Sequence, residues 1–341
     1  MQIKKVVTIG GGTGSFVLLS GLKKYPIKLS AIVSMADNGG STGILRDELG
    51  VLPPGDIRQC LVALSDSSNE MRKLMNYRFE SGIFKGHSFG NLFLTVLEKI
   101  NNNFLEAINQ AGKILNIKGE IVPVTTSNVN LYMELKNGKI LKGESEISLN
   151  KNILKTGIKK IYLKPQPKVN SNAVFKIKEA NMIVIGPGNL YSSILPNLII
   201  PEIKKAILES KAIVVYNCNL VNKKGQTDNF KLDDYVNIIN SYLGKNRINF
   251  VTFNSHKPPE FLIKKYIKKG EKIVELGKVS KNKNYKIVLA DLLDLKEYRP
   301  SKSDVLIKER SFIRHNADKL AKVLMLILEF KENQNILKNI I

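Results

Sequence analysis

The sequence contains few cysteines, no tryptophan and no long apolar run. Its two cysteines, Cys60 and Cys218, lie far apart and outside any Cys-x-x-Cys or Cys/His cluster, so the pattern supports neither a disulfide framework nor a structural zinc site. No apolar stretch approaches the roughly 18 residues that a membrane-spanning helix needs. Glycines interrupt the apolar segment near the N-terminus, where a signal peptide requires a helix. We therefore expect a cytoplasmic protein without a membrane span.

Arginine is also scarce, although the chain is strongly basic. Eight of the 53 Lys and Arg residues are arginine, and the formal net charge is +23. The lysines are scattered, whereas nucleic-acid sites usually combine clustered Lys and Arg with stacking aromatics, and aromatic residues make up only 7% of this chain. The charge therefore indicates a solvated, lysine-rich surface without a nucleic-acid site. Four arginines nevertheless gather in the first quarter of the chain: Arg46, Arg58, Arg72 and Arg78.

Short β-branched runs alternate with helical patterns over most of the 341 residues. Strand-like runs at 4–9 and 28–35 open the chain, and similar runs return at 181–185, 211–217 and 248–254. This alternation predicts an α/β fold with a doubly wound, mostly parallel sheet that helices cover on both faces. The length alone allows one large domain or two.

The middle of the chain follows a different pattern. Segments within about 119–165 alternate apolar and polar residues, and Asn137-Gly138 is a strong two-residue hairpin signal. We expect a small antiparallel β insertion here. No linker divides the chain, so we expect a single domain over residues 1–330, followed by a C-terminal tail over 331–341.

Glycine-rich loops follow several of the predicted strands. GGGTG occupies residues 10–14, ADNGGSTG 36–43 and GPGN 186–189, and the polar NCN of 217–219 ends another strand. In doubly wound sheets, ligands bind beyond the carboxyl ends of the strands. We therefore expect these loops to meet in one crevice.

The first glycine loop predicts an anion site. Its backbone can approach a ligand closely, and it leads into a predicted helix whose first amides favour a phosphate. Gly10, Gly12 and Ser15 also fit a relaxed dinucleotide pattern, with Asp37 about where an acid would hold a ribose hydroxyl. A tight turn without a ligand is the alternative interpretation.

The segment DNGGSTGILRDELGVLPPGDIRQ, residues 37–59, predicts a phosphate clamp. Its loop from Asn38 to Gly43 carries hydroxyls and an amide, and Arg46 and Arg58 could hold a diphosphate through paired hydrogen bonds. Asp37 and Asp56 could pair with these arginines or bind Mg²⁺ beside the phosphates. For Asp56, a plain helix cap is an equal alternative.

Histidines offer little support for acid–base chemistry. His87, in the loop 86–91 before another predicted helix, has no evident carboxylate partner, which favours a structural role. His315 lies beside Arg314 at a helix start, where the pair could contact an anion or cap the surface. No spacing fits a Ser-His-Asp set or a glycosidase carboxylate pair, so no catalytic residue is assigned.

Five segments together resemble the gluconeogenesis-factor family, bacterial cytoplasmic proteins related to 2-phospho-L-lactate transferase (CofD-like). They are VVTIGGGTG, SMADNGGSTGILRDELGVLPPGDIRQCLVALSD, GHSFGNLFLTVL, IVIGPGNLYSSILPNL and IRHNADKLAK, which occur in this order over nearly the whole chain. The resemblance implies a Rossmann-like, three-layer α/β/α fold. It also implies a regulatory protein that binds a nucleotide sugar of the UDP-N-acetylglucosamine type and supports cell shape and envelope synthesis during gluconeogenic growth. We expect a homo-oligomer, a dimer, that controls a protein partner.

The loops and the resemblance together give the expected nucleotide- and phosphate-binding residues. The second-half members are implied by the resemblance alone. The set is Gly11, Gly12, Thr13, Gly14, Asp37, Asn38, Gly40, Ser41, Arg46, Gly55, Asp56, Arg58 and Asn91, facing Gly186, Gly188, Asn197, Asn217, Thr227 and Arg314.

The chain departs from the family pattern at three positions. Asn189, Gln226 and Asn316 stand where the family usually has Ser, Glu and Asp. Each change removes a hydroxyl or a charge, which favours binding over catalysis, and a binding protein needs no cofactor. The alternative is a Mg²⁺-dependent transferase of a phospholactyl or phosphoacyl group from a nucleotide carrier, with Asp37 and Asp56 holding the metal. An NAD-dependent oxidoreductase would rest on the dinucleotide pattern alone.

Overall fold

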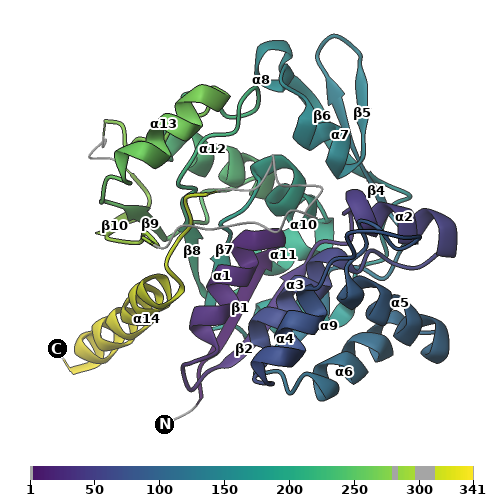
Figure 1. Cartoon of the computed structure of the whole chain (residues 1–341). Helices are drawn as coiled ribbons and strands as arrows, with labels where there is room; N and C mark the ends of the chain where they lie inside the picture. Colours follow the sequence, from purple (N-terminus) through teal and green to yellow (C-terminus); the bar gives the residue numbers. More distant parts are fainter. Residues whose placement is uncertain (1–2, 279–282, 296–311, 341) are drawn as a thin grey trace.

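A seven-stranded parallel sheet forms the centre of the computed structural model, which describes residues 3–278, 283–295 and 312–340, with the backbone alone for 331–340 (Figure 1). The strand order is β10-β9-β8-β7-β1-β2-β3, so β1 lies between β2 and β7 and the order reverses there. Such a reversal opens a crevice at the carboxyl ends of the strands. The strands are β1 (Lys5–Gly10), β2 (Lys28–Val33), β3 (Glu120–Pro123), β7 (Met182–Ile185), β8 (Ile213–Asn217), β9 (Phe250–Asn254) and β10 (Lys286–Ala290).

The central strands are almost continuously apolar because both faces of the sheet are covered. In β1, Val7 and Ile9 point into the core on one face, while Val6 points into the core on the other. Ile183 and Ile185 of β7 extend the first core, and Ile9 pairs in register with Ile185. A parallel sheet with two buried faces requires such runs. The predicted doubly wound α/β fold is therefore confirmed.

Helices pack on both faces of this sheet and produce three layers (Figure 1). One face carries α1 (Gly12–Leu22), α3 (Gly55–Leu64), α4 (Asn69–Asn76), α5 (Phe89–Asn101), α6 (Phe104–Ile114) and α14 (Ala317–Ile340). The other face carries α9 (Ser171–Glu179), α10 (Leu195–Leu198), α11 (Pro201–Glu209) and α12 (Leu232–Leu243). A short π-helix, η1 (Leu190–Ile194), precedes α10, and α2 (Gly40–Leu49) and α13 (Glu260–Lys269) lie in the loops after β2 and β9.

The C-terminal helix α14 packs against α1 and continues to Ile340. Residues 331–340 are therefore helical, and the expected separate tail is not what the structure shows; residue 341 lies outside the described residues. Across the described ranges, no helix combines the length and the apolarity that a membrane span requires.

The insertion is a three-stranded antiparallel sheet in the order β5-β4-β6. It consists of β4 (Asn130–Leu135), β5 (Ile140–Lys142) and β6 (Ile158–Lys164), with α7 (Gly143–Leu149) and α8 (Ile153–Thr156) between the last two strands. The predicted Asn137-Gly138 turn joins β4 to β5 and is confirmed. The predicted start of the insertion near residue 119 is wrong, because β3 pairs in parallel with β2 at the edge of the main sheet.

A buried-side-chain truncation in β7 tests the central role of this strand. Ile185 is fully buried, so we expect Ile185→Ala to lower the free energy of unfolding by about 2–5 kcal/mol through the cavity it leaves. Urea titration followed by circular dichroism measures this loss. Ile83 is 91% exposed and provides the matched control, because Ile83→Ala should leave the unfolding midpoint nearly unchanged. Equal midpoints for Ile185→Ala and the unsubstituted protein would contradict the packing described above.

Candidate functional site

A cavity of about 360 Å³ lies where the strand order reverses, at the carboxyl ends of the strands. Its walls include four segments that are far apart in the sequence: Gly11–Gly14 after β1, Asp37 and Gly39 after β2, Pro187–Asn189 after β7, and Asn219–Lys223 after β8. Residues of α3, α7, η1 and α13 and the segment 313–315 complete them. The predicted meeting of the glycine-rich loops at one crevice is therefore what the structure shows. The volume lies within the range typical of small-molecule sites.

Two glycines of the first loop permit very close packing between these walls. A Cβ atom on Gly14 would lie 1.9 Å from the carbonyl oxygen of Pro187, and one on Gly11 would lie 2.1 Å from Oδ2 of Asp56. Side chains at these positions would therefore separate the loops. The backbone amide of Gly12 donates a hydrogen bond to Oδ1 of Asp56 at 2.8 Å. This amide, which we expected to face a phosphate, is occupied by a carboxylate of the protein.

Four carboxylates line the cavity, and three of them, Asp37, Asp56 and Glu144, lie close to one another; the fourth is Glu271. Burial raises the pKa of all three groups, to about 7 for Asp56. The negative charge of Asp37 raises the pKa of Asp56 further, and both aspartates do the same for Glu144. These carboxyl groups therefore hold their protons more tightly than exposed ones do, and a nearby cation or hydrogen-bond donor would favour their ionised form.

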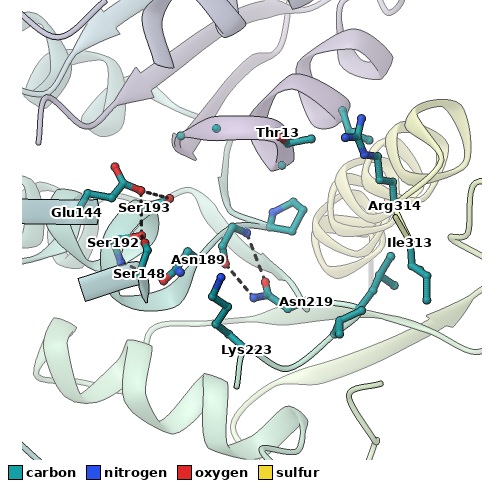
Figure 2. Close-up of a pocket in the computed structure, with 18 of the residues that line it drawn as sticks. Thr13, Glu144, Ser148, Asn189, Ser192, Ser193, Asn219, Lys223, Ile313 and Arg314 are labelled. Carbon is teal, nitrogen blue, oxygen red and sulfur yellow. Dashed lines mark hydrogen bonds between the residues drawn. The ribbon is translucent and has the colours of Figure 1, made fainter. Parts of the chain in front are cut away.

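Three cationic side chains, Lys223, Lys269 and Arg314, line the same cavity. Figure 2 shows Arg314 at the far side of the cavity from Glu144, with Lys223 between them on the lower wall. The hydroxyl of Thr227 accepts a hydrogen bond from the backbone amide of Lys223 at 2.8 Å, which fixes the start of this turn. The cavity therefore has an acidic side and a basic side.

The predicted arginine clamp is wrong, because neither Arg46 nor Arg58 lines the cavity. The Arg46 guanidinium donates to the carbonyl of Val129 at 2.7 Å. The Arg58 guanidinium donates a hydrogen bond from Nε to Oδ1 of Asn91 at 2.9 Å. The reason lies in helix geometry: Asp56 on α3 faces the cavity, and a residue two positions later points about 200° around the helix axis. The positive charge of Arg58 still lowers the pKa of Asp37 and Asp56 against the effect of burial.

The other predicted site residues divide into two groups. Those that line the cavity are Gly11, Gly12, Thr13, Gly14, Asp37, Asp56, Gly188 and Arg314. Those that do not line it are Asn38, Gly40, Ser41, Gly55, Asn91, Gly186, Asn197, Asn217 and Thr227. Several of the second group support the walls from behind. Asn217, for example, donates to the carbonyl of Gly186 at 3.1 Å and so holds the loop after β7.

The two histidines that the sequence singled out have different surroundings. Nδ1 of His87 lies 3.1 Å from the Ser41 hydroxyl, outside the cavity wall. His315 is buried at the cavity wall, and burial lowers its pKa to about 4. His315 is therefore neutral at physiological pH, so the positive charge next to it comes from Arg314 alone.

Sequence reasoning missed a second set of lining residues. Lysines are so common in this chain that Lys223 and Lys269 carried no signal, and the insertion was expected to form strands without a helix. The GPGN motif, by contrast, pointed to Asn189, and NCN pointed to Asn219, which exchanges two hydrogen bonds with the backbone of Gly188 (Figure 2). The missed polar residues include Gln59, Glu144, Ser145, Ser148, Ser192, Ser193, Asn222, Lys223, Tyr266, Lys269 and Glu271.

Two departures from the family pattern meet beside the cavity. The amide of Asn189 donates to Oε1 of Gln226 at 3.4 Å, while Oδ1 of Asn189 accepts from the backbone amides that begin η1. The third departure, Asn316, caps α14 by accepting from the amides of Asp318 and Lys319. All three amide side chains thus have structural roles in the described residues.

Comparisons with known proteins agree with the fold and the loops. The family model for 2-phospho-L-lactate transferase CofD matches residues 6–293. A gluconeogenesis factor of Listeria innocua is 40% identical over 332 residues, which cover 97% of each chain. The gluconeogenesis factor of Bacillus subtilis is 35% identical over 332 residues, 96% of this chain and 99% of the relative. A crystal structure of a UPF0052 family member from Bacillus halodurans has a TM-score of 0.83 at 35% identity, and the match covers 95% of this chain and 99% of that one. These matches show that the chain belongs to the 2-phospho-L-lactate transferase CofD family and is similar over most of its length to the gluconeogenesis factors.

Proposed function

We propose that the cavity binds a nucleotide sugar of the UDP-N-acetylglucosamine type, and that the protein is a cytoplasmic regulator of cell shape and envelope synthesis during gluconeogenic growth. The observation that carries the proposal is the set of cationic side chains, Lys223, Lys269 and Arg314, which line the same cavity as the glycine loop at the start of α1. Similarity to gluconeogenesis factors supports the physiological setting. In this setting the liganded protein, as a homodimer, controls a protein partner.

The chemistry of this wall suits a diphosphate. A guanidinium group can donate two parallel hydrogen bonds to phosphate oxygens, and an ammonium group supplies a compact positive charge. Asp56 occupies the Gly12 amide at the start of α1, so the attraction for the diphosphate comes from Lys223, Lys269 and Arg314. The diphosphate would therefore lie between Thr13 and the cationic residues, in the part of the cavity most distant from Glu144 (Figure 2).

A transferase is the second candidate, because Asp37 and Asp56 offer ligands that suit Mg²⁺. Each aspartate uses Oδ1 to accept a backbone amide, from Gly39 and Gly12 respectively. Mg²⁺ is usually held by one or two carboxylates together with substrate phosphates and water. In the described residues no group of three His, Cys, Asp or Glu could hold a metal, so an ion on the two aspartates would need phosphate oxygens or water as its other ligands. Such an ion would neutralise charge on a phosphoryl group during transfer.

Calorimetric titration tests the proposed ligand class. We expect UDP-N-acetylglucosamine to bind more tightly than millimolar, and Lys223→Ala to weaken this binding about tenfold or more through loss of a charge-assisted hydrogen bond. The adjacent Lys224 is exposed and does not line the cavity, so Lys224→Ala should bind like the unsubstituted protein. Failure of every uridine nucleotide to bind, or equal losses in the two variants, would refute the proposed role of this wall.

The raised pKa values predict that the free energy of unfolding depends on pH and that Mg²⁺ reduces this dependence. A buried carboxyl whose pKa is raised keeps its proton in the folded state after the unfolded chain has lost it, so stability falls as pH rises from about 4 to about 7. For Asp56 the slope is up to about 1.4 kcal/mol per pH unit. Urea titrations at pH 5 and pH 8 measure the change in the free energy of unfolding, and Asp56→Asn should make this change smaller.

Mg²⁺ provides the second arm of this experiment. We expect millimolar Mg²⁺ to stabilise the protein at pH 8 more than at pH 5, because only the ionised carboxylates attract the cation. In the Asp56→Asn variant, Mg²⁺ should stabilise the protein equally at the two pH values. Equal stabilisation by Mg²⁺ at both pH values, or in both proteins, would show that the aspartates do not bind the ion.

A further inference from the structure

Glu144 lies on α7 of the insertion, at the side of the cavity opposite Arg314 (Figure 2). Its Oε1 accepts hydrogen bonds from the hydroxyls of Ser192 at 2.9 Å and Ser193 at 3.5 Å. The Ser148 hydroxyl in turn donates to that of Ser192 at 3.2 Å. One carboxylate and three hydroxyls, here called the Glu144 cluster, thus gather at this side, and all four residues line the cavity.

The main domain holds α7 in place from both ends of the helix. At its start, Gly143 has φ +84°, and a Cβ there would lie 2.0 Å from Nδ2 of Asn38. Oδ1 of Asn38 also accepts from the backbone amide of Ser145 at 3.1 Å. At its end, Nε2 of Gln226 donates to the carbonyls of Ile147 at 2.8 Å and Ser148 at 3.0 Å. Glu144 is therefore presented to the cavity by fixed backbone, as a recognition site requires.

The Glu144 cluster does not suit a phosphate or a metal ion. Its carboxylate lies near Asp37 and Asp56, and this negative charge repels phosphate oxygens. Among the described residues no three acids, histidines or cysteines are arranged to share a cation, so Glu144 does not complete a metal site with the two aspartates. What the cluster offers is strong hydrogen-bond acceptance beside three hydroxyls, each of which can donate or accept. Uncharged hydroxyl groups of a ligand match this set.

We propose that the Glu144 cluster binds the hydroxyl groups of an uncharged sugar attached to the diphosphate, and that this acidic side of the cavity disfavours ligands with a carboxylate at that place. The inference rests on the proposed nucleotide-sugar function, because it takes the basic side of the cavity as the diphosphate site. Arg314 and the Glu144 cluster lie on opposite sides of the same cavity, so we place the sugar on the Glu144 side of the diphosphate (Figure 2). The insertion then selects the sugar, while the loops of the main sheet bind the nucleotide.

Three nucleotides and two matched variants separate these roles. UDP lacks the sugar. UDP-glucose and UDP-glucuronate differ at one position of the sugar, which carries a hydroxymethyl group in the first and a carboxylate in the second. We expect the unsubstituted protein to bind UDP-glucose at least tenfold more tightly than UDP-glucuronate in calorimetric titrations. Glu144→Gln should lower the affinity for UDP-glucose severalfold and raise the affinity for UDP-glucuronate. The affinity for UDP should not change, because only the sugar contacts this residue. Glu146→Gln, on the exposed side of the same helix, should change none of the three affinities.

The results distinguish a failure of the proposed function from a failure of this inference. If no uridine nucleotide binds the unsubstituted protein, the proposed function fails and this inference fails with it. If the nucleotides bind but Glu144→Gln leaves the preference between the two sugars unchanged, or weakens UDP as much as UDP-glucose, only this inference is overturned. Should Glu144→Gln fail to fold, Ser148→Ala serves in its place, with a severalfold loss of UDP-glucose affinity and unchanged UDP affinity as the expected result. Unchanged affinity for both would overturn the inference.

Discussion

The close contact between the loop after β1 and the loop after β7 is the constraint on which the cavity depends. Gly14 touches the Pro187 carbonyl so closely that even a methyl group would force the two loops apart. These loops belong to neighbouring strands on the two sides of the topological reversal, and each begins a helix. Their contact therefore sets the distance between two walls of the site. Asn219, in the loop after β8, donates to the carbonyl of Gly188 and so holds the loop after β7 from its other side.

A second level of organisation lies behind the walls. Arg46 and Arg58 are buried, and their hydrogen bonds connect α2 and α3 to the segments at Val129 and Asn91. Burying a guanidinium group is costly unless its donors are satisfied and negative charge is nearby. The carboxylates of Asp37 and Asp56 supply that charge from the cavity side. The acidic side of the cavity and the buried arginines thus stabilise each other through the loops between them.

The sequence predicted the sheet and the loops far better than the directions of side chains. Runs such as residues 5–10 are mostly apolar and β-branched and end in glycines, and this combination is typical of a central parallel strand. Asn137-Gly138 fixed the hairpin for an equally local reason. The direction of Arg58 depends on how α3 is rotated about its axis, which the long-range packing of α3 on α1 decides. The helix α7 escaped prediction because, apart from Gly143, only Ile147 of its seven residues is buried, so it carries no apolar periodicity.

The separation of charge within the cavity has a consequence for how molecules enter it. Charges of both signs line a small, partly enclosed volume and create an electric field within it: the carboxylates of Asp37, Asp56, Glu144 and Glu271, and the cations of Lys223, Lys269 and Arg314. Such fields extend beyond contact distance and act on a solute before any hydrogen bond forms. A molecule with an anionic end and a neutral end is turned by this field as it approaches, and it arrives in a single orientation.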